Sequence, residues 1–564
     1  MIGVIAEEHE IDVVREFFEL FKTPWEVYQP EQSYEVIIVA REGVFPSERA
    51  KLVVHYSGCT LMADCQGAAE LKKGGCNLLY NGVRIPVYGS VVSCKHKQEA
   101  FLIEEGTNAA VGYEEKANDG TYVRMGYDLF QEIRTLLTVG QLPANANIPT
   151  VELHITLLRD LIVGSGASLV EIPPIPDGFS FIACLTHDID HPSIRLHRWD
   201  HTLFGFIYRA LVGSLVRVLK RRMPVRHLMT NYGAVAKLPL VRLGLAKDFW
   251  HGFDRYHEFE EGAASTFFAL PFKGVPGMTA NGPAPHFRGS SYGVADIADQ
   301  MKKIVASGSE VGLHGIDAWK EIGKGQAEKA EIVTITGATN VGVRMHWLYF
   351  NEESPATLDK AGFSYDSTVG YNETIGYRAG TAQAFKPFQA THLLELPLHV
   401  MDTAMFYQDY LDLTFEEADR RIGSIIDYAC QLGGVVTFNW HDRSIAPERL
   451  WGDFYSGLVR SLKRRDAWCT SAGKAVSWFR NRRSVVFERT QQGVQVTCIK
   501  PDPGRDKNVP GLRLRFYNVR MAYESTSPRY VDATLNCSVT IGFDGRNVAS
   551  RKQDLNPISP CKNS

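Results

Sequence analysis

Short apolar runs that end in His, Asp, Glu or Arg recur through the middle of the chain. They occupy residues 181–191, 310–317, 342–347, 393–398 and 434–442. Each run has the length of a buried strand, and the segments between them are long enough for helices. This alternation predicts an α/β fold with parallel strands arranged as a barrel. Reactive side chains gather at the carboxyl ends of such strands, so we expect a functional site there.

The first third of the chain predicts a separate unit. Residues 3–6 and 35–40 are apolar runs typical of buried strands, and residues 10–21 between them carry apolar side chains at helical spacing. This β-α-β start indicates an N-terminal α/β domain over residues 1–177, which ends in a proline-rich stretch. No Gly-x-Gly-x-x-Gly loop occurs in it, so dinucleotide binding is not supported.

After Arg483 the pattern changes again. Apolar residues alternate with polar ones at period two, and turn signals separate the runs, in residues 485–489, 494–498, 512–516 and 533–539. This alternation predicts a small C-terminal β-sandwich over residues 484–564, with a polar, disordered end from Arg551 to Ser564. The domain either binds glycan or caps the barrel.

Composition agrees with a multi-domain chain of ordinary globular protein. A chain of 564 residues is too long for a single hydrophobic core, so we expect several domains. The net charge of −3 gives no reason to expect nucleic-acid binding. The ten cysteines include no Cys-x-x-Cys pair, and the start lacks a secretory signal, so we expect a cytoplasmic protein with reduced thiols. We expect no membrane span. Leu203–Leu219 is expected to pack on the barrel, with peripheral contact to a membrane surface as the alternative.

The most informative motif is Thr186-His187-Asp188-Ile189-Asp190-His191. Positions i and i+2 of a strand share a face, so the two carboxylates point the same way. Like charges this close raise each other's pKa unless a cation lies between them. The pair therefore suits a metal-assisted hydrolase, with one carboxylate as a ligand and the other as the general base. A strand-to-loop turn is the alternative reading.

The order of these motifs resembles the polysaccharide deacetylase family, also called the NodB-homology or carbohydrate esterase family 4. The resemblance covers roughly residues 178–482. It implies a distorted (β/α) barrel over residues 178–483 and hydrolysis of N-acetyl groups with a divalent metal. By this resemblance Asp188 is the general base and Arg344 orients it. His441 is the general acid, and the Trp347 amide is the oxyanion donor.

The metal ligands implied by the resemblance are Asp190 and His314. The family's second motif usually has another histidine four residues after the first, but this chain has Ala318 there. Asp317 is one residue short of that position and is the expected third ligand. The competing candidates in the sequence are His187, His191 and His346. Zn²⁺ is the expected metal, with Mn²⁺, Co²⁺ or Fe²⁺ as alternatives for a site rich in carboxylate.

These expectations combine into a hydrolase of carbon–nitrogen bonds other than peptide bonds. The predicted function is a metal-dependent deacetylase acting on an N-acetylated amino sugar in a polysaccharide or glycan precursor. Glu395 or Asp402 is expected to raise the pKa of His441, so that it can protonate the departing amine. Two alternatives stay open: another amide hydrolase on the same scaffold, such as a deformylase, and a catalytically dead glycan-binding protein.

Overall fold

A curved parallel sheet forms the centre of the molecule in the computed structural model. The structure describes residues 1–41, 50–61, 64, 69–95, 100–117, 120–491, 493–498, 509–518, 530–535 and 539–542. The central sheet has the strand order β20-β19-β18-β17-β14-β13-β22-β21, with β23 also paired to β13. Every pairing between these strands is parallel. This curled sheet is consistent with the distorted barrel expected from the sequence.

The five apolar runs of the sequence each contain a strand of this sheet, which has nine strands in all. They are β13 (Phe181–Ile189), β14 (Thr266–Ala269), β17 (Glu310–Gly315), β18 (Val343–Met345), β19 (Tyr365–Asp366), β20 (Leu394–Glu395), β21 (Val400–Met401), β22 (Val435–Asn439) and β23 (Ala467–Thr470). All nine residues of β13 are buried, because helices and loops cover both of its faces. Register places Thr186 opposite Asn439 and His314 opposite Arg344, which brings the motifs to one end of the sheet.

Helices between the strands cover the outside of the sheet. They are α7 (Phe253–Phe259), α8 (Ala298–Ala306), α9 (Ile322–Thr336), α10 (Ser354–Lys360), α11 (Asp402–Phe406), α12 (Phe415–Leu432), α13 (Gly452–Arg464) and α14 (Ala472–Arg483). Helix α12 begins with a capping box. The Thr414 side chain accepts a bond from the Glu417 amide, and the Glu417 side chain accepts one from the Thr414 amide. Its apolar face then packs on the main core.

The N-terminal residues form a second sheet with helices packed against it, which we call the N-terminal layer. Its parallel half contains β1 (Ile2–Ile5), β2 (Trp25–Val27), β3 (Val36–Val39) and β4 (Leu52–Tyr56). An antiparallel half follows, with β5 (Ala69–Lys72), β6 (Cys76–Tyr80), β7 (Val83–Val87), β8 (Val91–Cys94), β9 (Ala100–Glu104), β10 (Ala110–Ala117) and β11 (Gly120–Met125). Helices α1 (Ile11–Phe21), α2 (Leu129–Thr138) and α3 (Thr150–Gly164) complete this layer.

The C-terminal strands do not form a self-contained unit within the described residues. Strands β24 (Val485–Thr490), β25 (Gly493–Cys498) and β28 (Val539–Gly542) make one antiparallel sheet. Strands β26 (Leu512–Tyr517) and β27 (Tyr530–Leu535) instead join β12 (Leu169–Glu171), which belongs to the first 177 residues. The predicted disordered end, residues 551–564, lies outside the described residues.

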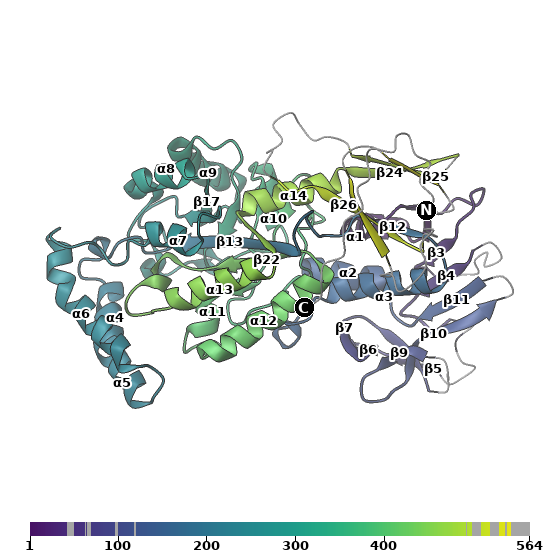
Figure 1. Cartoon of the computed structure of the whole chain (residues 1–564), viewed down its shortest axis with the longest axis horizontal. Coiled ribbons are helices and arrows are strands. Elements are labelled where there is room, and N and C mark those ends of the chain that lie inside the picture. Colours follow the sequence, from purple (N-terminus) through teal and green to yellow (C-terminus); the bar gives the residue numbers. More distant parts are fainter. Residues whose placement is uncertain are drawn as a thin grey trace.

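Buried polar contacts join the N-terminal layer to the barrel. Arg482 of α14 is fully buried and donates hydrogen bonds to the backbone oxygens of Glu19, Leu20 and Ile172. Glu152 of α3 accepts a 2.6 Å bond from the Thr381 hydroxyl. Figure 1 shows the resulting elongated arrangement, with the N-terminal layer at one end of the long axis.

A helical arm leaves the barrel at the other end of the long axis (Figure 1). It consists of α4 (His201–Tyr208), the π-helical turn η4 (Arg209–Gly213), α5 (Ser214–Leu219) and the returning helix α6 (Val225–Arg242). We call residues 201–247 the arm. By length and composition, one helical stretch in the described chain, His201–Leu219, is apolar enough to cross a membrane, with a mean hydropathy of 1.5.

Candidate metal and catalytic site

The motifs meet in one cavity at the carboxyl ends of the central strands. The cavity has a volume of about 610 Å³, and Asp188, Asp190, His314 and His346 line it together. His441 faces the same carboxylates, with its Nε2 atom 3.9 Å from Asp190 Oδ2. The structure therefore brings together Asp188, Asp190, His314 and His441 from motifs more than 100 residues apart.

Asp188 is held by two donors in a buried setting. Arg344 Nη1 lies 2.9 Å from Asp188 Oδ1, and Asn439 Nδ2 lies 2.7 Å from Asp188 Oδ2. Burial opposes ionisation, but the Arg344 guanidinium and the nearby imidazoles outweigh it and lower the pKa of Asp188 below its ordinary 3.8. The carboxylate is thus ionised and fixed in orientation, which is the state that a proton acceptor needs.

Arg344 is fully buried and anchored on every side. Its Nε donates to the Ser367 carbonyl at 3.0 Å, its Nη2 to the Ser367 hydroxyl at 3.0 Å, and its Nη1 to the Thr186 hydroxyl at 2.8 Å. The guanidinium also lies 4.6 Å from the Phe268 ring centre. These contacts hold the Arg344 guanidinium in place beside Asp188.

A cluster of ligand type surrounds Asp190. His314 Nε2 lies 3.5 Å and His346 Nε2 lies 3.8 Å from Asp190 Oδ1, and the three ligand atoms lie within 4.8 Å of one another. Asp190 Oδ1 is buried without a hydrogen-bond partner. Two ligands each about 2.1 Å from a tetrahedral zinc ion are separated by about 3.4 Å. The residues therefore fit a divalent metal, because it would satisfy this oxygen and both imidazoles.

Asp190 and His346 have the protonation states of metal ligands. Burial opposes the charge of His314, but Asp188 and Asp190 outweigh it and raise the pKa of His314, so this residue would release a proton on metal binding. His314 Nδ1 donates to the Arg344 carbonyl at 3.0 Å, which leaves Nε2 to face Asp190. Burial and the neighbouring His314 lower the pKa of His346 to about 3, so its imidazole is neutral at pH 7. Despite burial, His314 and the other imidazoles hold the pKa of Asp190 well below its ordinary value. A neutral imidazole and an ionised carboxylate are the forms that ligate metals.

His441, which lies beside Asp190, is paired with Asp402. His441 Nδ1 lies 2.6 Å from Asp402 Oδ1, and Asp402 Oδ2 accepts a bond from the Ser444 hydroxyl. Burial opposes the charge, but Asp402 outweighs it and raises the pKa of His441 to about 10. Of the two carboxylates expected beside His441, the structure selects Asp402. Glu395 instead lies next to Asp366, and burial together with the charge of Asp366 raises the pKa of Glu395 well above its ordinary value. One oxygen of Glu395 accepts a hydrogen bond from the Val369 amide.

Asp317 is not brought to the ligand cluster, in contrast to the expectation from the sequence. Its Oδ1 accepts a 2.7 Å bond from the Met278 amide, and its Oδ2 lies 3.2 Å from Lys324 Nζ. Both oxygens thus serve the loop around residues 278–283 and helix α9. His346, one of the three competing histidines, occupies the place that was assigned to Asp317.

The other two competing histidines have structural partners. His187 points to the opposite face of β13, where its Nε2 lies 2.8 Å from Glu260 Oε1 and its ring contacts Tyr256 and Phe267. His191 lines the cavity but its Nδ1 lies 3.3 Å from His197 Nε2. Asn439 was missed by sequence reasoning. Its position at the end of an apolar run, directly after Phe438, could have indicated that its side chain lies at the site.

The third strand-end motif continues into a strained turn at the cavity wall. Trp347 and Leu348 have left-handed backbone angles, with φ of 68° and 52°. Non-glycine residues rarely adopt these angles, so the surrounding contacts must enforce them. Arg288 supplies one such contact, because its guanidinium lies 5.0 Å from the Trp347 ring centre. The turn exposes the Trp347 side chain by 50% and puts this residue, the expected oxyanion donor, at the cavity wall.

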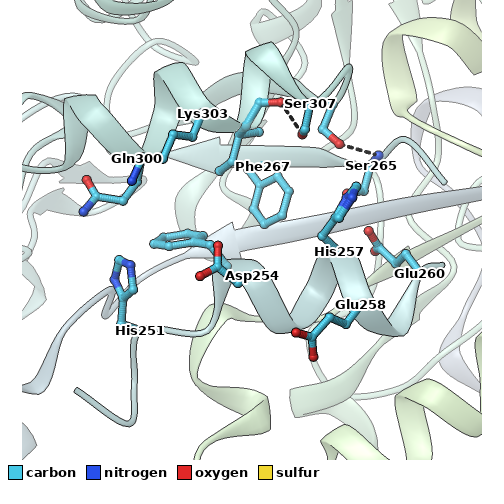
Figure 2. Close-up of a pocket in the computed structure, with 13 residues that line it drawn as sticks. His251, Asp254, His257, Glu258, Glu260, Ser265, Phe267, Gln300, Lys303 and Ser307 are labelled. Atoms are coloured by element: carbon cyan, nitrogen blue, oxygen red, sulfur yellow. Dashed lines mark hydrogen bonds between the residues drawn. The ribbon is translucent and has the colours of Figure 1, made fainter. Parts of the chain in front are cut away.

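A second cavity lies on the outer side of the sheet and is separate from this site. It has a volume of about 320 Å³ and lies between α7 and α8, as Figure 2 shows. Glu260, the partner of His187, borders it together with His257 and Lys303. Its lining includes neither Asp190 nor any other residue of the ligand cluster, so the candidate metal site belongs to the first cavity.

Comparison with known proteins gave results only at the level of structure. No family model and no curated protein matches the chain. Among solved structures, a protein from Mycobacterium smegmatis assigned as a polysaccharide deacetylase is 15% identical, with 59% of this chain and 100% of the other covered and a TM-score of 0.32. The novel carbohydrate deacetylase Agd3 is 9% identical, with 96% and 99% covered and a TM-score of 0.35. The structural neighbours thus include deacetylases of carbohydrates, the class that the sequence motifs resemble.

Proposed function

We propose that the protein is a metal-dependent deacetylase that hydrolyses the N-acetyl group of an amino sugar in a polysaccharide or glycan precursor. One observation carries the proposal. A fixed, ionised carboxylate (Asp188) and a three-residue ligand cluster (Asp190, His314 and His346) line one cavity, and a protonated imidazole (His441) lies 3.9 Å from Asp190. Amide hydrolysis needs a base, an electrophile and an acid in this arrangement.

Asp188 acts as the general base in this proposal. Arg344 and Asn439 occupy its oxygens from the side of the protein core, so its position is set before substrate arrives. It takes the proton from the attacking water. A metal held by Asp190, His314 and His346 would polarise the acetyl carbonyl and acidify that water. Asp188 therefore needs only a modest basicity of its own.

His441 acts as the general acid for the leaving amine. Its Nδ1 is committed to Asp402, so Nε2 is the atom that faces the cavity and gives up the proton. A pKa of about 10 keeps the imidazole protonated at neutral pH. Without this proton the tetrahedral intermediate would have to expel an amide anion, which is a far poorer leaving group than an amine.

The expected oxyanion donor, the backbone amide of Trp347, belongs to the same proposal. The positive φ of Trp347 turns the chain sharply after Met345, at the wall of the cavity. An N–H group aimed at the developing oxyanion supplements the charge of the metal. The turn therefore offers a reason for a backbone conformation that is otherwise costly.

The test combines metal content with acetate release from N-acetyl-chitooligosaccharides. We expect about one metal per chain in the wild type and acetate release that is lost in Asp188→Asn with the metal retained. Metal bound without acetate release would assign the site to another acyl group or substrate. A folded protein that binds no metal under any loading condition would contradict the proposal and favour a glycan-binding role.

A further inference from the structure

The helical arm carries far more exposed apolar surface than the rest of the molecule. Twelve of the 25 large apolar side chains exposed in the described chain lie between Trp199 and Leu245. Tyr208, Val212, Leu215 and Leu219 follow one another at helical spacing, and Leu219 is 74% exposed. Single exposed apolar residues are normal on protein surfaces, whereas a contiguous patch marks an interaction site.

This patch is not needed to fold the arm. The opposite faces of α4 and α6 already form a small core, with Leu203, Phe206 and Leu238 packed against Trp250. Arg195 ties the base of the arm down, since it donates to the backbone oxygens of Val241 and Ala246. The arm thus has a buried inner face and a second, outward apolar face that no described part of the chain covers.

The charge of the arm identifies the kind of partner. Residues 201–247 contain nine Lys or Arg residues and no Asp or Glu, although the whole chain has a net charge of −3. The basic residues gather where α5 turns into α6, at Arg217, Lys220, Arg221, Arg222 and Arg226. Exposed apolar side chains interspersed with cations alone are the composition of a helix that lies in a lipid interface. Two copies of the arm would repel each other.

Cationic side chains also predominate among the charged residues that line the cavity between the arm and the barrel. This cavity has a volume of about 600 Å³, and six cationic side chains line it against the two carboxylates of Asp409 and Glu448. Arg443 is 4% exposed there, and its Nε lies 3.2 Å from Glu448 Oε1. The other five cationic side chains are half-buried or exposed, and they outnumber the carboxylates of the lining, so this cavity suits a phosphoryl headgroup.

We propose that the arm docks the protein on an anionic lipid surface, with the outward faces of α5 and α6 in the headgroup layer. Interfacial binding fits better than a span, because Arg209 and Arg217 interrupt the apolar stretch and α6 returns with its own cations. His201 and Thr202, at the start of the arm, line the cavity of the candidate site. Docking would therefore hold the rim of that cavity close to the headgroups.

Sedimentation of the full chain with vesicles tests the proposal without reference to any enzymatic activity. Phosphatidylcholine vesicles with phosphatidylglycerol are compared with vesicles of phosphatidylcholine alone. We expect binding to the anionic vesicles that is at least tenfold stronger, because each basic residue near such a surface contributes about fivefold. High salt should weaken it.

Two variants with matched controls locate the contact. Leu215→Glu/Leu219→Glu should reduce binding more than tenfold, whereas Val139→Glu/Leu142→Glu, on exposed apolar residues of the N-terminal layer, should leave it unchanged. Lys220→Glu/Arg226→Glu should also reduce it, in contrast to Lys302→Glu/Arg464→Glu on the barrel. Circular dichroism confirms that each variant is folded.

Two results would overturn the proposal. One concerns vesicle binding: the folded wild type does not bind anionic vesicles at low salt, or the arm variants bind them as strongly as the wild type does. The other concerns the oligomeric state: light scattering shows a dimer, Leu215→Glu/Leu219→Glu dissociates it, and no variant binds vesicles. The outward apolar face would then join two copies of the chain.

Discussion

His441 and Asp402 form a buried imidazole–carboxylate pair, with Nδ1 and Oδ1 separated by 2.6 Å. The backbone amide of His441 donates to the second carboxylate oxygen at 2.8 Å, so the carboxylate fixes both the ring and the chain that carries it. The two proton states at the site have different causes: despite burial, Asp402 keeps the His441 imidazole protonated, whereas the Arg344 guanidinium and the nearby imidazoles keep Asp188 ionised.

Replacing Asp402 should shift the pH dependence of turnover. The general acid works when protonated, so activity falls as pH rises through the pKa of His441, which is about 10. Asp402→Asn removes the anion that raises this pKa, so the alkaline limb should move toward the ordinary imidazole value of about 6.5. Acetate release measured from pH 5 to 10 checks this. Ser444→Ala, which removes a neutral partner of Asp402, is the control, and an unmoved limb in Asp402→Asn would contradict the acid role of His441.

The third metal ligand can be assigned by comparing two residues. His346→Ala should weaken metal binding by at least 10–100-fold, the loss usually seen when even an outer-sphere partner is removed. Asp317→Asn should leave metal affinity nearly unchanged, because both Asp317 oxygens already bind Met278 and Lys324. Calorimetric titration with Zn²⁺ measures both. The reverse order of effects would support the ligand expected from the sequence.

Arg344 should matter for stability as well as for catalysis. Arg344→Met leaves the Asp188 carboxylate buried without its main counter-charge, which costs about 3–5 kcal/mol in comparable pairs. Arg344→Met/Asp188→Asn removes both charges and should lose less than the sum of the two single changes. Urea unfolding of the four proteins gives the coupling free energy. Additive losses would mean that the pair is not coupled in the folded state.

Glu152 should make stability depend on pH. Its Oε2 is buried without a partner, and burial raises the pKa of Glu152 from 4.5 to about 7. The folded state therefore holds a proton that the unfolded state releases, so stability falls as pH rises between these values and stays low above pH 7. The loss is on the order of 3 kcal/mol. Glu152→Gln, which needs no proton, should flatten this slope in unfolding curves at pH 5 and pH 8. Glu416→Gln, on an exposed residue, is the control.

The sequence by itself determined where five of the nine central strands lie and which side chains stand at their ends. Period and apolar content alone place β13, β17 and β22, and the pleat of a strand puts Asp188 and Asp190 on one face. These are local properties, fixed by the spacing of residues along a strand. The same is true of the first strands and the helix of the N-terminal layer.

Only the tertiary structure decided what those side chains contact. Along the chain Asp317 was the expected third ligand and His346 a competing candidate, but the Asp317 carboxylate binds Met278 and Lys324, whereas His346 faces Asp190. Strand β26 likewise pairs with β12, more than 300 residues away. Distances between segments far apart in sequence depend on sheet order and register. No local period encodes either, so the third ligand and the C-terminal pairing had to come from the fold.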